Sequence, residues 1–243
     1  MTQLAGDHVQ VLVGGYELTG DMNRVAVSDA RDTHDVTAFS DAVHKFVPGQ
    51  RKISLEHSGY MNADAARSHP VLKGAALEGV VSVLLGQNAA PAAGDPVYSL
   101  AVLQGKYGVS PEIAKVILFS AAFANRGSQG GWGVALAVPV SFTNSSNGSA
   151  VDNGAASSGG GAAYLHVLQA AASDTYTLTV EGSATGAFSG EQSTLATFAA
   201  NGSALASERQ AIGGSIPRYT RWKAVRSGSA GDTVAIAVSI VRF

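Results

Sequence analysis

The acidic side chains that lie closest together in this sequence are aspartates between residues 21 and 41. Asp29, Asp32 and Asp35 recur every three residues around Arg31, so that two carboxylates could share general acid and base work. Aspartates this closely spaced more often form turns and caps, because their carboxylates accept hydrogen bonds from nearby backbone amides. We therefore predict no catalytic residues here. The candidate is instead an acidic surface segment made of Asp21, Asp29, Asp32, Asp35 and Asp41.

Histidines offer a second kind of chemistry, a metal site. His34 and His44 lie near Asp35, and His57 and His69 follow. None of them shows the four-residue spacing or the H-E-x-x-H pattern that places two imidazoles on one face of a helix. The chain has no cysteine, which excludes zinc–thiolate sites, disulfides and thiol nucleophiles. The sequence predicts no metal site.

Serine nucleophiles and phosphate loops are also missing. No G-x-S-x-G pattern occurs, and Gly127-Ser128-Gln129-Gly130 and Gly228-Ser229-Ala230-Gly231 have a different spacing. Gly159-Gly160-Gly161 lies in a low-complexity stretch and does not join a strand to a helix, as a phosphate loop would. We predict a protein that is not an enzyme and binds no cofactor.

One aromatic and basic cluster remains, in residues 218–223. Strand alternation places Arg218 and Trp222 on one face and Tyr219 and Arg221 on the other. Stacking on nucleic acid is one interpretation. A strand with inward aromatics and outward basic stems is the interpretation that we favour, because no other basic patch accompanies the cluster. Exposed Tyr219 and Trp222 would instead indicate a carbohydrate-binding module.

The composition narrows the class of protein further. Of 243 residues, 46% are hydrophobic and 14% are charged, and the net charge is -2. This balance argues against a dedicated nucleic-acid binder, which needs a basic face, and against a disordered chain. No apolar run is long enough to span a membrane, and no secretory signal pattern is visible. Because ordinary domains are about 25% charged, we interpret the low charge as a sign of a surface covered by a partner.

The elements that must position these residues are predominantly strands. Alternating β-branched residues between glycine and proline turns predict an all-β fold. Residues 113–123 follow a helix-like start at Ser110-Pro111-Glu112 but are short and apolar, so the local signals leave helix and strand open and lean slightly to helix. Residues 38–46 are predicted as a short helix or a loop. The predicted strands cover residues 8–13, 16–19, 23–28, 52–60, 77–85, 96–104, 134–140, 164–169, 176–181, 195–199, 209–212, 219–225 and 234–243.

The chain divides at a stretch rich in Asn, Ser, Gly and Ala. We predict an N-terminal β-barrel or sandwich over residues 1–143, a linker or long loop over residues 144–162, and a C-terminal β-sandwich over residues 163–243. Charge is also uneven along the chain. No Lys or Arg lies between Arg126 and Arg209. Residues 21–41 contain five aspartates and only two basic residues, Arg24 and Arg31.

Two sets of short motifs resemble those of phage and prophage major tail proteins. The N-terminal set comprises residues 16–23, Arg31-Asp32, Asp35-Val36-Thr37-Ala38-Phe39, residues 46–52 and the strand ending in Gly59-Tyr60. The C-terminal set comprises His166-Val167, Leu178-Thr179-Val180, Thr197-Phe198 and Arg218-Tyr219-Thr220-Arg221. The sharper parts cover about a third of the chain, and no motif in residues 61–162 contributes.

This resemblance implies a structural virion protein. Tail tube subunits form stacked hexameric rings around a channel for double-stranded DNA, and their sheets continue between subunits. For residues 113–123 the resemblance favours a strand over a helix. The resemblance thus implies partners among copies of this chain and other tail proteins, a location in the virion after assembly in the host cytoplasm, and no membrane. It also makes the five aspartates candidates for the channel or an interface, because weak repulsion of phosphate would let DNA slide.

Two further classes of function stay open from the sequence. A capsid decoration or fibre-associated protein would bind a preformed shell instead of making tubes. A carbohydrate-binding module would use Tyr219 and Trp222. An enzyme has no support beyond Asp29, Asp32 and Asp35.

Overall fold

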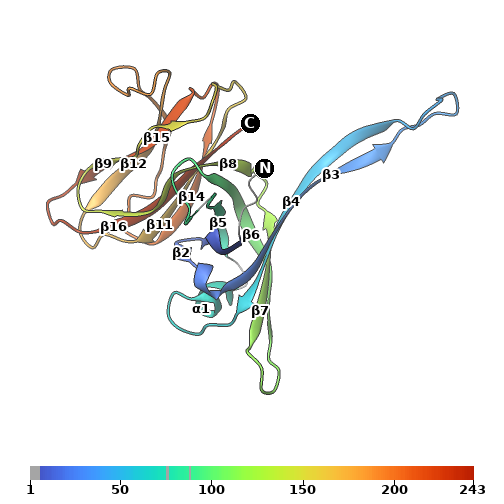
Figure 1. Ribbon diagram of the computed structural model, residues 1–243, viewed down its shortest axis with the longest axis horizontal. Coiled ribbons are helices and arrows are strands. Elements are labelled where there is room, and N and C mark those ends of the chain that lie inside the picture. Colours follow the sequence, from blue (N-terminus) through green and yellow to red (C-terminus); the bar gives the residue numbers. More distant parts are fainter. Residues whose placement is uncertain (1–5, 75–76, 88) are drawn as a thin grey trace.

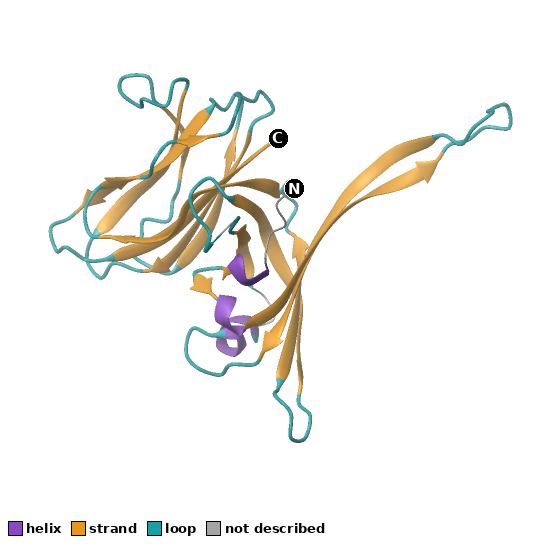
Figure 2. Cartoon of the chain, in the orientation of Figure 1, coloured by secondary structure: helices purple, strands orange, loops and turns teal. Residues whose placement is uncertain are grey.

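The computed structural model describes residues 6–74, 77–87 and 89–243. Strands dominate this part of the chain, and they are joined by turns, one five-residue α-helix, α1 (Ser68–Leu72), and two short 3-10 helices, η1 (Gly6–His8) and η2 (Thr19–Asp21) (Figure 2). The predicted all-β class is confirmed. The strands gather into one sheet of eleven strands and a second sheet of five.

The larger sheet runs through the whole molecule. Its strands follow the order β14-β11-β16-β8-β6-β5-β1-β2, and β7, β4 and β3 extend it from β6. Strand β6 branches because its first half pairs with β5 and β8, whereas its second half pairs with β7. The strands of the N-terminal part are β1 (Val9–Val13), β2 (Tyr16–Glu17), β3 (Met22–Asp35), β4 (Phe46–Tyr60), β5 (Glu78–Leu85), β6 (Pro96–Ser110), β7 (Leu118–Asn125) and β8 (Gly131–Phe142).

Strands β3 and β4 are far longer than the sequence indicates. They pair from Met22 and Gly59 out to Asp35 and Phe46, and the outer half leaves the body of the molecule as a projecting hairpin (Figure 1). We call residues 29–48 the arm. Nearly all of its side chains are exposed. Residues 38–46, predicted as a short helix or a loop, mostly form the turn at the tip of the arm.

A second, shorter hairpin projects from the other end of the same strands. Here β6 and β7 pair out to Ser110 and Leu118, and residues 111–117 form the turn between them (Figure 1). Of residues 113–123, predicted preferentially as a strand, 118–123 lie in β7. The first five lie in the turn, where Ala114 adopts a φ of 60°. We call residues 105–118 the β6–β7 end.

The C-terminal part is a sandwich of two sheets. Strands β14, β11, β16 and β8 face a five-stranded sheet, and Tyr176, Trp222 and Ile236 are among the buried side chains between them. Residues 144–162, predicted as a linker or loop, carry the two short strands β9 and β10, which pair with β15. The division of the chain at residues 143 and 163 stays a prediction. The remaining strands are β9 (Ser146–Asn147), β10 (Val151–Asp152), β11 (Gly161–Gln169), β12 (Thr175–Ser183), β13 (Ser193–Thr197), β14 (Ala206–Ile212), β15 (Tyr219–Ser227) and β16 (Val234–Arg242).

A buried polar chain joins the N-terminal strands to the sandwich. The imidazole of His166 on β11 contacts the Gly14 carbonyl oxygen at 2.6 Å through Nδ1 and the Ser82 hydroxyl at 2.8 Å through Nε2. Ser82, Ser99 and Ser239 then continue in 2.8 Å hydroxyl contacts from β5 to β6 to β16. Complete burial lowers the pKa of His166 to about 4. The neutral imidazole therefore helps to hold the two parts together.

Candidate assembly surfaces

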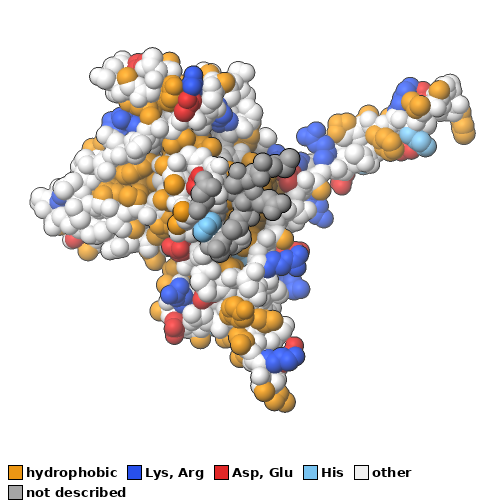
Figure 3. All heavy atoms as spheres, in the orientation of Figure 1, with side chains coloured by type: hydrophobic (Ala, Val, Ile, Leu, Met, Phe, Trp, Pro, Cys, Tyr) orange, Lys and Arg blue, Asp and Glu red, His pale blue; other side chains and the backbone are white. Residues whose placement is uncertain are grey.

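The arm ends in apolar side chains that its own subunit leaves uncovered. Phe39 and Val43 stand on the turn, and Phe46 follows at the start of β4. Figure 3 shows these hydrophobic side chains gathered toward the far end of the arm, well away from the body. Apolar surface exposed in a cluster marks a contact site, because a monomer gains nothing from it. The exposed large hydrophobic residues of the arm are Val36, Phe39, Val43, Phe46 and Val47.

The aspartates predicted as one acidic segment divide into a buried residue and an exposed group. Asp21 is buried, where its carboxylate accepts hydrogen bonds from the Ser68 backbone at 2.9 Å and from Asn62 at 3.1 Å. It therefore holds the start of α1 and is not part of an exposed acidic surface. This corrects the prediction for Asp21, which rested on sequence proximity alone. Asp29, Asp32, Asp35 and Asp41 lie on the arm.

Three of the arm aspartates are held by local partners. Hydrogen bonds from Arg51 lower the pKa of Asp29, and the Nε contact measures 2.6 Å. The Thr37 hydroxyl and backbone amide lower the pKa of Asp35, which also contacts His44 at 3.2 Å. Lys45 lowers the pKa of Asp41. These carboxylates stay ionised; Asp35 and Asp41 hold the hairpin turn in shape, and Asp29 joins β3 to β4 through Arg51. No group of three metal-ligating side chains occurs in the described residues.

The β6–β7 end carries a second uncovered apolar group. Ile113 is almost fully exposed, and Val116 and Leu118 lie beside it on the turn and on β7. Tyr60 on β4 pairs with Leu118 across the sheet. The exposed large hydrophobic residues of this end are Tyr60, Val109, Ile113, Val116, Ile117 and Leu118.

Strands β3, β4, β7 and β6 form a sheet with a free edge on each side. Over the described residues β3 pairs with β4 alone, and β6 beyond Leu103 pairs with β7 alone. A strand edge with unpaired amides and carbonyls is a template for pairing with another chain. The outward face of the sheet is built mainly of small side chains. They include Ala26, Ser28, Ser54, Ser58, Gly108, Ser120, Ala122 and Ala124.

An open apolar groove of about 720 Å³ lies beside the β3 edge. Strands β1 and β3 do not pair, so the sheet does not close into a barrel there. Trp132 stands on the groove with 56% of its surface exposed, and Arg24 is the charged side chain that lines it. Its apolar lining is Val9, Val11, Met22, Val25, Val27, Val83, Leu85 and Trp132.

The residues of the carbohydrate-binding alternative do not form an open platform. Trp222 is buried with 5% of its surface exposed, and its ring stacks on Phe142 at 5.3 Å between centroids. Tyr219 is half-buried, and the Arg218 guanidinium lies 5.0 Å from its ring centroid. The carbohydrate interpretation of Trp222 is therefore wrong. The inward packing of aromatics that we favoured for this strand, because no other basic patch accompanies it, holds for Trp222.

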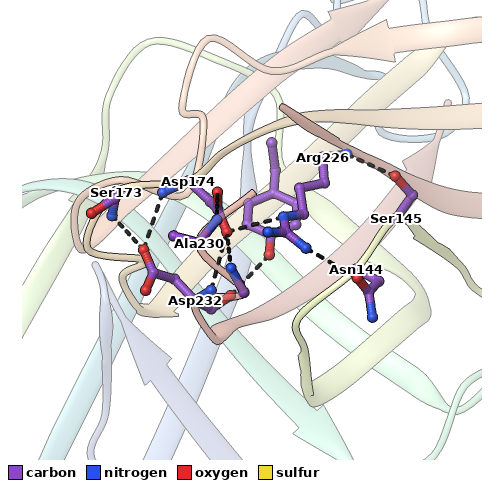
Figure 4. Close-up of polar contacts among 9 residues, drawn as sticks. Asn144, Ser145, Ser173, Asp174, Arg226, Ala230 and Asp232 are labelled. Carbon is purple, nitrogen blue, oxygen red and sulfur yellow. Dashed lines mark hydrogen bonds and ion pairs between the residues drawn. The ribbon is translucent and has the colours of Figure 1, made fainter. Parts of the chain in front are cut away.

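The most extensive polar cluster in the sandwich binds its own loops (Figure 4). Asp174 accepts hydrogen bonds from the backbone of Ala230, Gly231 and Asp232 at 2.8–3.1 Å and pairs with Arg226 at 3.0 Å. Burial alone would raise the pKa of Asp174, but the backbone donors and Arg226 outweigh it and lower that pKa. Arg226 also donates to Asn144 at 3.0 Å. The Asp174 carboxylate and the Nε and Nη1 of Arg226 have partners within the subunit, so the cluster stabilises the loops.

Sequence reasoning missed the groove and the free edges. Both depend on which strands fail to pair, and pairing is set by residues far apart in the chain. The sequence could have indicated the exposure of Phe39, because this residue lies outside every predicted strand, in the segment predicted as a short helix or a loop.

Known proteins resemble this chain in fold but not in sequence. No protein-family model matches the chain, and no curated protein matches it significantly. Solved structures with a similar fold include one from the virion of a native gene transfer agent particle, at 14% identity over 54% of this chain and 98% of that chain, with a TM-score of 0.42. Another is the SPP1 tail tube, at 11% identity over 53% and 79% of the chains and a TM-score of 0.43.

A third similar structure extends over both parts of the molecule. The SPP1 Dit (gp 19.1) protein, from the hub adsorption apparatus of phages that infect Gram-positive bacteria, matches 96% of this chain and 99% of its own at 8% identity and a TM-score of 0.35. Among the described residues, no helix has the length and apolarity that crossing a membrane requires. Structures from a virion and from a tail tube are thus among those to which this chain is similar.

Proposed function

We propose that this chain is a structural virion protein, the major tail tube subunit of a long-tailed phage. Copies assemble into hexameric rings that stack into a conduit for double-stranded DNA, together with other tail proteins. The observation that carries the proposal is the pair of free edges on one four-stranded sheet. In this proposal the subunit has a structural and not a catalytic role, and it assembles in the host cytoplasm.

The two free edges explain how a ring would close. One edge belongs to β3 and the other to the outer half of β6, so a copy can offer β3 to the β6 of its neighbour. An interface between two unlike surfaces repeats from copy to copy and forms a ring when the rotation closes. Pairing all copies in this way removes every exposed edge of the sheet.

The apolar groove would be covered in the same step. It flanks the β3 edge, where the neighbouring copy arrives, and its valines and Trp132 would leave water. Removal of apolar surface contributes about 25 cal/mol per Å². This accounts for the low charge of the chain, because surfaces that copies cover need few charged side chains.

The outward face of the same sheet suits a channel wall. Small side chains give a smooth surface, and Glu56 lines the same shallow hollow as Arg24 and Lys106. The bases of this face are Arg24, Lys52 and Lys106, with Glu56 among them, and the small side chains between them limit the number of phosphate contacts, so DNA can slide. The aspartates of the arm lie beyond this wall. In this proposal they belong to contacts between rings and not to the channel lining.

Imaging of the purified protein tests the proposal. We expect rings or tubes in negative-stain micrographs and a corresponding large species in light scattering. Trp132→Glu places a charge in the groove and should abolish these species while the subunit stays folded. Val225→Glu is the matched control, because Val225 is 45% exposed but lies on the five-stranded sheet. A wild-type protein that stays monomeric at every concentration contradicts the proposal, as does equal loss of assembly in both variants.

A further inference from the structure

We propose that the arm tip of one copy docks on the β6–β7 end of a copy in the next ring. The inference rests on the proposed tube and adds the contact that joins its layers. It assigns one partner, a second copy of this chain, to both uncovered apolar groups. The chain carries one of each, so every copy would give one contact and receive another.

Both groups are apolar enough to form such a contact. Phe39, Val43 and Phe46 project from the arm, and Ile113, Val116 and Leu118 project from the β6–β7 end. Neither group packs against its own subunit, because its side chains are exposed. Figure 3 shows hydrophobic side chains uncovered at the ends of both hairpins. Joining the two would remove from water the largest side chains that the sheet leaves exposed at its ends.

The positions of the two groups suit stacking. They lie at opposite ends of the same antiparallel strands, because β4 runs from Phe46 in the arm to Tyr60 beside Leu118 (Figure 1). This strand has 15 residues, and at about 3.3 Å per residue it spans roughly 50 Å. A copy translated along the strands by about this length brings its β6–β7 end to the arm tip. The contact joins unlike surfaces, so repetition gives an open stack with one direction.

The charges of the two ends have opposite signs. Asp29 pairs with Arg51 at the base of the arm, and at the arm tip Asp35 and Asp41 stand against Lys45. The β6–β7 end carries Lys106 and Lys115 against Glu112. Two arm tips would repel each other, whereas an arm tip and a β6–β7 end attract weakly. Charge thus favours head-to-tail docking over symmetric pairing and sets the direction of the stack.

Disulfide trapping tests this contact, because the natural chain contains no cysteine. One preparation carries Phe39→Cys and the other, made longer by a tag, carries Ile113→Cys. After mixing, assembly and mild oxidation, we expect mixed dimers as the main linked product. Phe39→Cys mixed with Val225→Cys is the matched control and should stay unlinked. Dimers of Phe39→Cys alone would overturn the proposal in favour of symmetric pairing.

The same assemblies separate this inference from the proposed function. If rings or tubes form but Phe39→Cys never links to Ile113→Cys, the docking proposal is wrong and the tube proposal stands. If the wild-type protein forms no assembly, the tube proposal itself fails. As a second measurement, Phe39→Asp should leave single rings in micrographs and remove long tubes. Long tubes of normal length in Phe39→Asp would also overturn the docking proposal.

Discussion

The two tryptophans of the chain lie in different environments, one in a packed core and one on an exposed surface. Trp222 lies inside the C-terminal sandwich, stacked on Phe142, in a region whose charged groups pair with one another. Trp132 stands half in water on an apolar groove beside an unpaired strand edge. The sandwich buries most of its large apolar side chains in a core of its own, whereas the sheet of β3, β4, β7 and β6 leaves apolar side chains exposed and strand edges unpaired. The first region stabilises the subunit, and the second is available for contact between copies.

The charged groups of the sandwich and of the arm differ in the same way. Glu181 is buried and receives hydrogen bonds from Arg221 at 2.8 Å and Lys223 at 3.0 Å. Burial would raise the pKa of Glu181, but these two cations outweigh it and lower that pKa. At the arm tip, Lys45 and His44 keep most of their side-chain surface in water, so their pairs with Asp41 and Asp35 contribute little to stability. A charge in the sandwich therefore serves the fold, and a charge on the arm is free to guide association.

The largest effect that tests this comparison is expected for Trp222→Ala. Removal of a buried tryptophan should lower the free energy of unfolding by about 3–5 kcal/mol, because a cavity replaces a packed ring. Trp132→Ala is the matched change at an exposed position and should alter that free energy by less than about 0.5 kcal/mol. Urea unfolding of both variants measures the difference. Equal losses would contradict the assignment of the two regions.

Local patterning was sufficient to predict most strands of both regions. Residues 234–243 and 176–181 alternate between β-branched and smaller or polar residues, and both form strands of the sandwich. The direction of Trp222 also followed from alternation in residues 219–225. Such strands bury one face in their own subunit, so their pattern records the core directly.

The surfaces between copies were not predictable in the same way. The outer half of β3, residues 29–35, faces no core of its own, so its sequence has no alternating apolar face to recognise. Asp21 was grouped with the arm aspartates because of its position in the sequence, yet it is buried against Ser68, 47 residues away. The groove arises because β1 and β3 do not pair. Two strands that do not pair leave no periodic pattern in the sequence that would indicate the gap between them.

The second effect is a loss of folding stability in acid, which we expect from the two buried histidines. Burial lowers the pKa of His57 and of His166 to about 4 in the folded protein, against 6.5 in the unfolded chain. The unfolded state therefore binds more protons between these values. The stability is fully present above pH 6.5 and falls as the pH drops toward 4, by roughly 3 kcal/mol for each residue. Urea unfolding at a series of pH values measures this loss.

Two variants sharpen the acid prediction. Neither ring nitrogen of His57 has a hydrogen-bond partner among the described residues, whereas His166 joins Gly14 and Ser82. His57→Leu should therefore keep its stability at neutral pH and lose about half of the acid dependence. His166→Leu should lose about 1–3 kcal/mol already at neutral pH, because it leaves buried partners unpaired. An acid dependence unchanged in His57→Leu would show that the protein does not hold this imidazole neutral.

The smallest effect is spectroscopic and reports directly on the assembly region. In Trp222→Phe, Trp132 is the single tryptophan, and its indole is exposed in the lone subunit. Assembly through the groove would move this indole from water to an apolar contact, so its emission maximum should shift to shorter wavelength as the protein concentration rises. The variant with both Trp222→Phe and Phe39→Asp should keep the shift, because rings cover the groove and the arm tip joins only successive layers. A shift that disappears with Phe39→Asp would place Trp132 at the contact between layers and break the separation between ring contact and stacking contact.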